Sequence, residues 1–137
     1  MGQQQLLLII LGVIIVGIAI AVGLQLFQSG SVGANQDAIV NDIMNIAAHA
    51  DQYRIRPEAM GGGGGEFTGY TLPVRLNETG NGSYTATSTA DDVTIVGTSA
   101  LGYGTITLTY TPDPSQTDAD DQYEWGSDGD FAGAFGD

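Results

Sequence analysis

The chain contains no cysteine and no lysine among its 137 residues, and histidine and tryptophan occur once each. Without cysteine there is no disulfide and no thiolate nucleophile, and without lysine there is no Schiff base. His49 has no second histidine or cysteine to complete a transition-metal site, so we expect it to have a packing or surface role. Nothing indicates a Ser-His-Asp triad. We therefore expect a protein that is not an enzyme, with no catalytic and no metal-ligating residues.

Positive charge is also scarce. Arg54, Arg56 and Arg75 stand against 16 acidic residues, which gives a formal net charge of -13. Nucleic-acid binding needs a cationic face that displaces counterions from phosphate, so we expect no such partner. Strong acidity keeps a protein soluble through self-repulsion and is used where salt screens that repulsion, which favours a salt-loving source.

One long apolar run occupies the start of the chain, from Leu6 to Leu26, within residues 1–28. Its 21 residues would form a helix of ~32 Å, close to the ~30 Å hydrocarbon thickness of a bilayer. A cleaved signal peptide has a shorter apolar region after a basic start, and no lysine or arginine precedes this run. A helix in a soluble core would need more apolar surroundings than the remaining chain supplies. We expect a membrane-competent or filament-core helix.

The positive-inside rule cannot predict the orientation of this helix in a membrane, because neither end of the run carries lysine or arginine. Only five residues precede it, so we expect the bulk of the chain on the exported side. The expected location of the helix is therefore a membrane.

Residues 29–57 are predicted to contain an amphipathic helix. The stretch "QSGSVGANQD" at its start is a linker, a kink or part of one long helix. Asn35 is expected to be the N-cap, and Pro57 should end the helix near Arg54. Val40 and Met44 widen the apolar stripe, which suggests a sheet on one flank and another subunit on the other. The stripe itself follows helical spacing: Ile39, Ile43, Ile46, Ala47, Ala50 and Tyr53.

Residues 58–112 are predicted to form a glycine-rich connector and an antiparallel sheet. The five glycines at 61–65 are not a nucleotide P-loop, because that motif requires Gly-Lys-Ser/Thr. We expect a flexible or tightly folded connector. Strands are predicted at 83–89, 93–98 and 104–111, and an edge strand at 67–73. The predicted fold class is α+β: a long N-terminal helix, apolar then amphipathic, packed on a sheet of three to four strands.

The segment 113–137 holds 8 of the 16 acidic residues, yet four aromatic residues are spread through it. A disordered acidic tail would have few aromatics, so we expect these rings to anchor the segment over the sheet or a neighbour. The rings are Tyr123, Trp125, Phe131 and Phe135. The carboxylates could bind calcium, but their spacing does not match an EF-hand, and a solvated acidic surface is the favoured interpretation. These carboxylates are Asp118, Asp120, Asp121, Glu124, Asp128 and Asp130.

Two N-glycosylation patterns occur, Asn77-Glu-Thr79 and Asn81-Gly-Ser83. Both lie in a turn-rich region that would be accessible in an exported domain. We therefore name Asn77 and Asn81 as possible glycosylation sites.

The start "GQQQLLLIILGVIIVGIAIAVG" resembles the N-terminal segment of type IV pilins and of the pseudopilins of type II secretion. Pilins usually carry Glu at the fifth mature position, where this chain has Gln5; an amide can hydrogen-bond a neighbour's ammonium but cannot neutralise it. A basic leader ending in glycine is also absent. Either it is removed before Met1, or Gly2 ends a minimal leader, or the chain is not processed in this way; we favour no cleavage after Gly2.

The resemblance implies a major structural subunit of a type IV pilus-like extracellular filament, a helical homopolymer with N-terminal helices in its core. It also implies an assembly platform and an ATPase as partners. The alternatives are a pseudopilin or minor pilin, and a monomeric membrane-anchored binding module. Adhesion, motility and DNA uptake are not distinguished.

Small residues in the apolar run are candidates for close helix contacts in such a filament. Gly17 with Ala21 and Ala19 with Gly23 form small-xxx-small pairs. Gly12, Gly17 and Gly23 are also candidate points of bending, because an interior glycine lowers helix propensity by ~1 kcal/mol relative to Ala.

Overall fold

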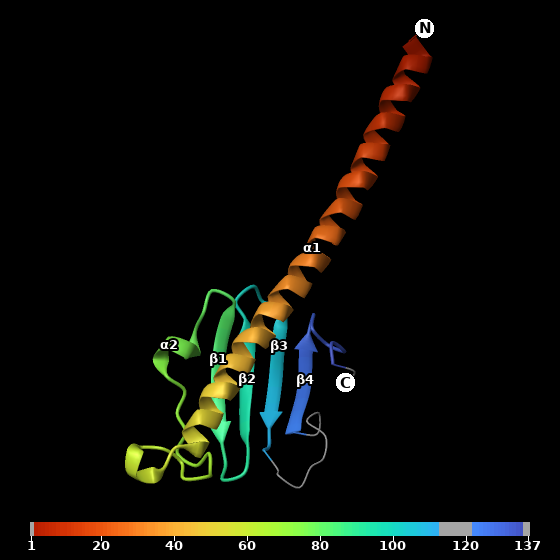
Figure 1. Ribbon diagram of the computed structural model, residues 1–137. Helices are drawn as coiled ribbons and strands as arrows, with labels where there is room; N and C mark the ends of the chain where they lie inside the picture. The colour runs from red at the N-terminus through yellow and green to blue at the C-terminus, as the bar shows by residue number, and fades with distance from the viewer. Residues whose placement is uncertain (1, 113–121, 136–137) are drawn as a thin grey trace. The chain divides into compact units, whose positions relative to one another are not determined.

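The computed structural model describes residues 2–112 and 122–135. The chain divides into two compact units, the first ending at Ala34 and the second beginning at Asn35. The elements in chain order are α1 (Gly2–Ile55), the 3-10 turn η1 (Glu58–Met60), the short helix α2 (Val74–Asn77), and the strands β1 (Gly82–Ser88), β2 (Val93–Ser99), β3 (Gly104–Tyr110) and β4 (Tyr123–Gly129) (Figure 1). The fold is α+β, with a long N-terminal helix packed on an antiparallel sheet, as predicted.

Helix α1 is 54 residues long and runs through the glycine- and serine-containing stretch 28–37 without a break. That stretch is therefore part of one long helix. The prediction that Asn35 is an N-cap is wrong, because Asn35 lies inside the helix and only 8% of it is exposed. Its side chain bonds to residues beyond the helix rather than to the backbone of a first turn. The helix ends at Ile55, close to the predicted end, and Pro57 disfavours helical geometry at the residue between them.

The sheet is a meander in the order β1-β2-β3-β4, and each neighbouring pair is antiparallel. Strands β1, β2 and β3 confirm the three predicted at 83–89, 93–98 and 104–111. The predicted edge strand at 67–73 is wrong. Phe67 and Tyr70 are both buried there, and the Tyr70 N–H donates to the Phe67 carbonyl at 2.9 Å, which makes a turn that directs both rings into the core.

The fourth strand is β4, which lies in the acidic C-terminal segment and pairs with β3, Trp125 opposite Leu108. The predicted anchoring of this segment by its rings is also observed. Tyr123 stacks on Tyr110 with ring centroids 4.9 Å apart, and Phe131 is 1% exposed. The rings therefore help to hold a strand in the sheet.

The core of the second unit lies between the sheet and residues 35–55 of α1, which cross one face of the sheet in Figure 1. Ile39, Ile43 and Ile46 are at most 1% exposed, and each buried isoleucine contributes ~1.5–3 kcal/mol. The i,i+3 ion pair between Arg54 and Asp51 is partly exposed and contributes at most ~1 kcal/mol. Apolar packing therefore holds the helix on the sheet. The sheet and loop residues of this core are Phe67, Tyr84, Val93, Ile95, Ile106, Leu108, Tyr110 and Phe131.

Gly97 in β2 leaves room for helix α1 against the sheet. A Cβ added there would lie 2.9 Å from Cγ2 of Ile39 and equally close to the Tyr84 ring. Glycine at this position therefore lets the first buried turn of the helix settle on the strand.

The glycines at 61–65 form a folded cap on the end of α1. The N–H groups of Gly63, Gly64 and Gly65 donate to the carbonyls of Tyr53, Arg56 and Arg54 at 2.8, 3.0 and 2.7 Å. Tyr53 and Arg54 belong to the last turn of α1, where carbonyls have no helical N–H four residues further on; the Tyr53 carbonyl also accepts from the Arg56 N–H at 3.3 Å. Of the two alternatives for the connector, the structure shows the tightly folded one. The N–H groups of Gly61 and Gly62 donate to the carbonyls of Glu58 and Pro57, so all five glycine amides bond to the backbone of the chain itself.

Glycine is required in this cap because the backbone is crowded, and a Cβ on Gly63 would overlap the carbonyl oxygen of Glu66. We predict that Gly63→Ala lowers the free energy of unfolding by about 2 kcal/mol, as expected for overpacking. Gly80→Ala is the control, since a Cβ there meets nothing within 4 Å, and it should change stability by less than about 0.5 kcal/mol. Denaturant unfolding of the detergent-solubilised chain measures both. Equal effects of the two substitutions would contradict the cap.

Candidate assembly surface

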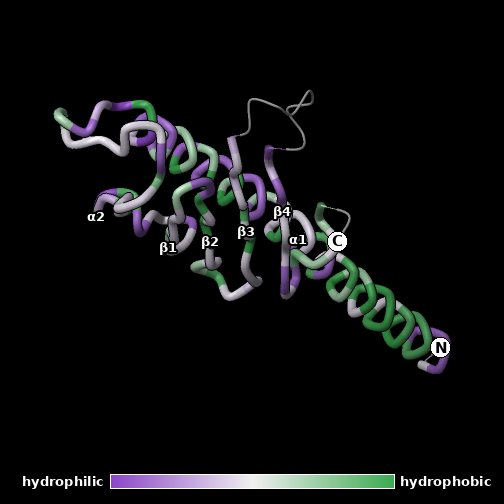
Figure 2. Tube along the Cα trace, turned by 90° about the horizontal axis from the view of Figure 1, so that it is seen from below, coloured by the Kyte–Doolittle hydropathy of each residue, from purple (hydrophilic) through white to green (hydrophobic). Residues whose placement is uncertain are grey.

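The apolar segment of α1, residues 6–27, exposes all of its large side chains. Their exposed fractions run from 49% at Val22 to 77% at Phe27. Figure 2 shows this part of the helix as hydrophobic along its length. The helix is long and apolar enough to cross a membrane. In water this surface would be strongly unfavourable, so the segment needs lipid or other apolar surfaces around it.

The small residues predicted to pack helices together all lie exposed on this segment. At ~100° per residue, Gly12, Ala19 and Gly23 fall within about 40° of one another on one face. Gly17 and Ala21 lie close together on the opposite face. A Cβ on any of the three glycines would meet nothing within 4 Å, so each leaves open space at the helix surface.

Gln5 lies at the polar start of α1 and is also exposed. The helix continues without interruption through Gly12, Gly17 and Gly23. Bending at these glycines inside a filament stays a prediction.

A polar clamp joins the helix part of the second unit to one end of the sheet. We use this name for six residues: Asn35 and Asp42 of α1, with Thr79, Asn81, Tyr84 and Ser99. The buried amide of Asn35 uses both of its ends. Its Nδ2 donates to the Asn81 carbonyl at 3.2 Å, and its Oδ1 accepts from the Ser99 hydroxyl at 2.6 Å. The Ser99 hydroxyl in turn accepts from the Leu101 N–H at 3.1 Å.

Asp42 is the charged centre of the polar clamp. One carboxylate oxygen, Oδ2, accepts from the Tyr84 hydroxyl at 2.5 Å, the Thr79 hydroxyl at 2.9 Å and the Asn81 amide at 3.0 Å. Partial burial raises the pKa of Asp42, but the hydrogen bonds from Tyr84, Asn81 and Thr79 outweigh it and leave the pKa below 3.8. The same contact and burial raise the pKa of the Tyr84 hydroxyl. The carboxylate therefore stays ionised and fixes three donors from the α2–β1 region.

His49 lies two turns further along α1, on nearly the same face as Asp42, and its Nδ1 is 3.0 Å from the Tyr70 hydroxyl. Burial lowers the pKa of His49, and the charges of Arg75 and Arg56 lower it further. Burial also raises the pKa of Tyr70 to about 12, so its hydroxyl stays protonated and can donate to the neutral imidazole. The packing role expected for His49 agrees with this geometry.

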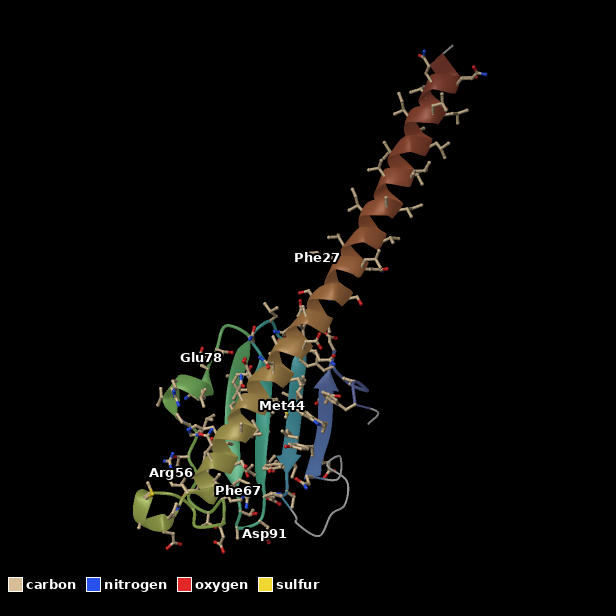
Figure 3. All side chains as sticks on the ribbon, in the orientation of Figure 1. Phe27, Met44, Arg56, Phe67, Glu78 and Asp91 are labelled. Atoms are coloured by element: carbon tan, nitrogen blue, oxygen red, sulfur yellow. The ribbon has the colours of Figure 1, made fainter. Side chains whose placement is uncertain are left out.

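The flank of α1 beside β4 carries a shallow hollow of about 180 Å³. Its lining residues are Met44, Ala47, Ala48, Asp51, Tyr110 and Tyr123. Met44, labelled in Figure 3, remains 39% exposed there. The expected second subunit on this flank of the helix stays a prediction.

The calcium prediction falls partly outside the described residues, since Asp118, Asp120 and Asp121 lie there. Within residues 2–112 and 122–135, no group of three or more histidine or acidic side chains is placed to hold a metal ion. Glu124 and Asp128 lie on the solvent side of β4 and are exposed.

The two glycosylation candidates differ in their surroundings. Asn77 ends α2 and is exposed. Asn81 is half-buried, and its Nδ2, the atom that a glycan would modify, donates to Asp42. The structure therefore leaves Asn77 accessible and holds Asn81 inside the polar clamp.

No family model, curated protein or solved structure matches the chain. Its functional interpretation therefore depends on the geometry above.

The sequence reasoning placed the apolar segment and its small residues, but it missed the polar clamp. A signal was available: Asp42 sits next to Ile43 within the buried stripe, and a carboxylate there needs a partner. The identity of the partners could not be derived, because Thr79, Asn81 and Tyr84 are at least 37 residues away along the chain.

We predict that Asp42→Ala lowers the free energy of unfolding by about 2 kcal/mol at neutral pH, since it removes a charged acceptor from three donors. Because the pKa of Asp42 is lowered in the folded chain, its stabilisation is complete above pH ~4 and is lost as the pH falls through the folded value. The difference in the free energy of unfolding between Asp42→Ala and the wild type should therefore become smaller at acid pH. Denaturant unfolding between pH 7 and pH 2 measures it. Asp37→Ala, an exposed carboxylate on the same helix, is the control.

If a host glycosylates this chain, we predict modification of Asn77 and not of Asn81. Intact-mass measurement should show that Asn77→Gln removes the added mass. Ser83→Ala, which breaks the second sequon at an exposed residue, should leave it unchanged. A glycan on Asn81 would contradict the clamp geometry.

Proposed function

We propose that this protein is a structural subunit of an extracellular type IV pilus-like filament, in which copies of the apolar segment form the fibre core. The observation that carries the proposal is the apolar segment itself. Residues 6–27 are helical, contain no charged residue and are exposed along their whole length. Such a segment must be covered by something outside the chain.

Exchange between lipid and a bundle of like helices is the step that a filament subunit has to make. Lipid tails are as apolar as leucine, so association of helices in a membrane depends on close packing and hydrogen bonds rather than on the hydrophobic effect. Moving the segment from lipid to copies of itself replaces one apolar surrounding by another. The open space at Gly12 and Gly23 on one face, and at Gly17 on the other, supports close approach to more than one neighbour.

The second unit supports the proposal because it has a core of its own. Its buried side chains come from residues 35–131, so the apolar segment contributes none of them. Transfer of the segment between surroundings therefore leaves this core intact. One surface binding a different surface on the next copy then gives a helical polymer when the rotation does not close a ring.

The test begins with material sheared from cells that express the chain. Electron microscopy should show long filaments, and mass spectrometry should show this chain as their major component. Short stubs of low abundance would instead favour a pseudopilin or minor pilin. Monomers that remain in the membrane fraction would favour the anchored binding module and overturn the filament.

A substitution on the small-residue face separates assembly from membrane insertion. We predict that Gly23→Leu lowers filament yield about fivefold, the equivalent of about 1 kcal/mol per helix contact, because leucine fills the space needed for close approach. The amount of chain in the membrane should not change, since the segment becomes more apolar. Ile14→Leu, which keeps the volume at an exposed position, is the matched control. Both yields are measured against total protein by quantitative immunoblotting.

A further inference from the structure

Within residues 2–112 and 122–135, two arginines of the second unit have no acidic partner. Arg54 is paired with Asp51 of its own helix turn at 2.9 Å. That is the one ion pair in the described part of the chain, and there Arg56 and Arg75 are both exposed without a carboxylate contact. In a chain of net charge -13, these two side chains are the positive charge still available to a partner.

Exposed apolar side chains gather beside these arginines. Five large apolar residues of the second unit are exposed: Met44, Ile55, Met60, Val74 and Leu101. Ile55 and Val74 directly precede Arg56 and Arg75, and Met60 ends the adjoining turn η1; their exposed fractions are 64%, 84% and 71% respectively. We call Ile55, Arg56, Met60, Val74 and Arg75 the arginine patch.

The two parts of the arginine patch lie at the same edge of the sheet: one follows α1 and the other belongs to α2, and Figure 1 shows the end of α1 and α2 both on the β1 side. The positive charges of both arginines also lower the pKa of His49. Figure 3 shows Arg56 at the end of α1, on the α2 side of the sheet.

The opposite edge of the sheet carries exposed carboxylates. Strand β1 lies at the α2 side and β4 at the other edge, as the strand order and Figure 1 show. Glu124, Asp128 and Asp130 of β4 and its following turn are all exposed. One chain therefore presents its unpaired cations and this group of carboxylates on different edges.

We propose that the arginine patch of one subunit docks on the β4 carboxylates of a second copy of this chain, a contact that repeats from subunit to subunit. The proposal rests on the filament function above, since exposed ion pairs are individually weak. The apolar segment supplies most of the binding free energy between copies, and the arginine patch determines which edge of one sheet contacts which edge of the next. Complementary charges contribute chiefly such specificity.

Charge is the reason to choose a second copy as the occupant. Acidic copies repel one another wherever carboxylate faces carboxylate. Glu58 and Glu78 flank the arginine patch, so it is close to neutral rather than strongly positive. The patch nevertheless contains the two arginines of the described residues that have no carboxylate contact, so it is where an acidic edge of another copy can bind. Contacts between different surfaces propagate along a fibre, as a filament requires.

The absence of lysine makes a direct test available. A water-soluble carbodiimide joins a lysine amine to a carboxylate that it contacts, without a spacer, and each substitution of arginine by lysine introduces a single side-chain amine. Sheared filaments of full-length Arg56→Lys and Arg75→Lys are treated with the reagent, and the linked peptides are identified by mass spectrometry. Arg54→Lys is the matched control, because that side chain is paired with Asp51 of its own chain.

The expected result is a ladder of dimers and trimers from Arg56→Lys and Arg75→Lys, with links to Glu124, Asp128 or Asp130. Arg54→Lys should give a link to Asp51 within the monomer and no ladder. Filaments of Arg56→Lys and Arg75→Lys that yield only monomer, or links to other carboxylates, would overturn the docking contact and leave the filament function standing. If wild-type cells make no filaments, the proposed function is wrong. The carbodiimide reaction on isolated membranes that contain the lysine variants then tests the contact by itself. Dimers linked to the β4 carboxylates would support it, and monomer alone would overturn it.

Discussion

A helix segment of 22 residues that has no charged residue and exposes its large apolar side chains is stable only where water is excluded. This constraint governs the rest of the molecule. The second unit must fold in its own right, because the apolar segment contributes no side chain to its core. The buried isoleucines of residues 39–46 and the strands β2 and β3 provide that separate core. A strongly acidic surface then keeps the folded unit in water while the segment stays out of it.

Helix α1 is held on the sheet by two kinds of interaction with different roles. The apolar face supplies most of the free energy, since its isoleucines are fully buried. The polar clamp fixes the rotation and the axial position of α1 on the sheet. Asn35 and Asp42 bond to particular groups on the α2–β1 connection and on β2, and a helix rotated or shifted along its axis would lose those partners. The clamp thus selects one register among several that apolar packing alone would accept.

Much of this fold could be predicted from periodicity. The spacing of Ile39, Ile43 and Ile46 indicated the buried helix face, and alternation in residues 104–111 indicated a strand. The assignment of Asn35 as a cap failed because a cap residue and a buried mid-helix amide look alike until the partner, Ser99, is known. Strand β4 was missed because "YEWGSDG" is rich in acidic residues and glycine, and its pairing with β3 overrides that weak local preference. The apolar segment could be predicted from the sequence alone, whereas the polar clamp could not be predicted without knowing which distant residues pack against the helix.

The glycine cap also bears on the order in which the chain folds. It closes a loop of about a dozen residues between Tyr53 and Gly65, for which the entropy of closure is small. Sheet contacts that involve β4 have to wait for a much longer stretch of chain to be brought together. A ribosome or secretion pore that releases this chain from its first residue would therefore deliver a helix already terminated at its far end, before the sheet that it will cover is complete.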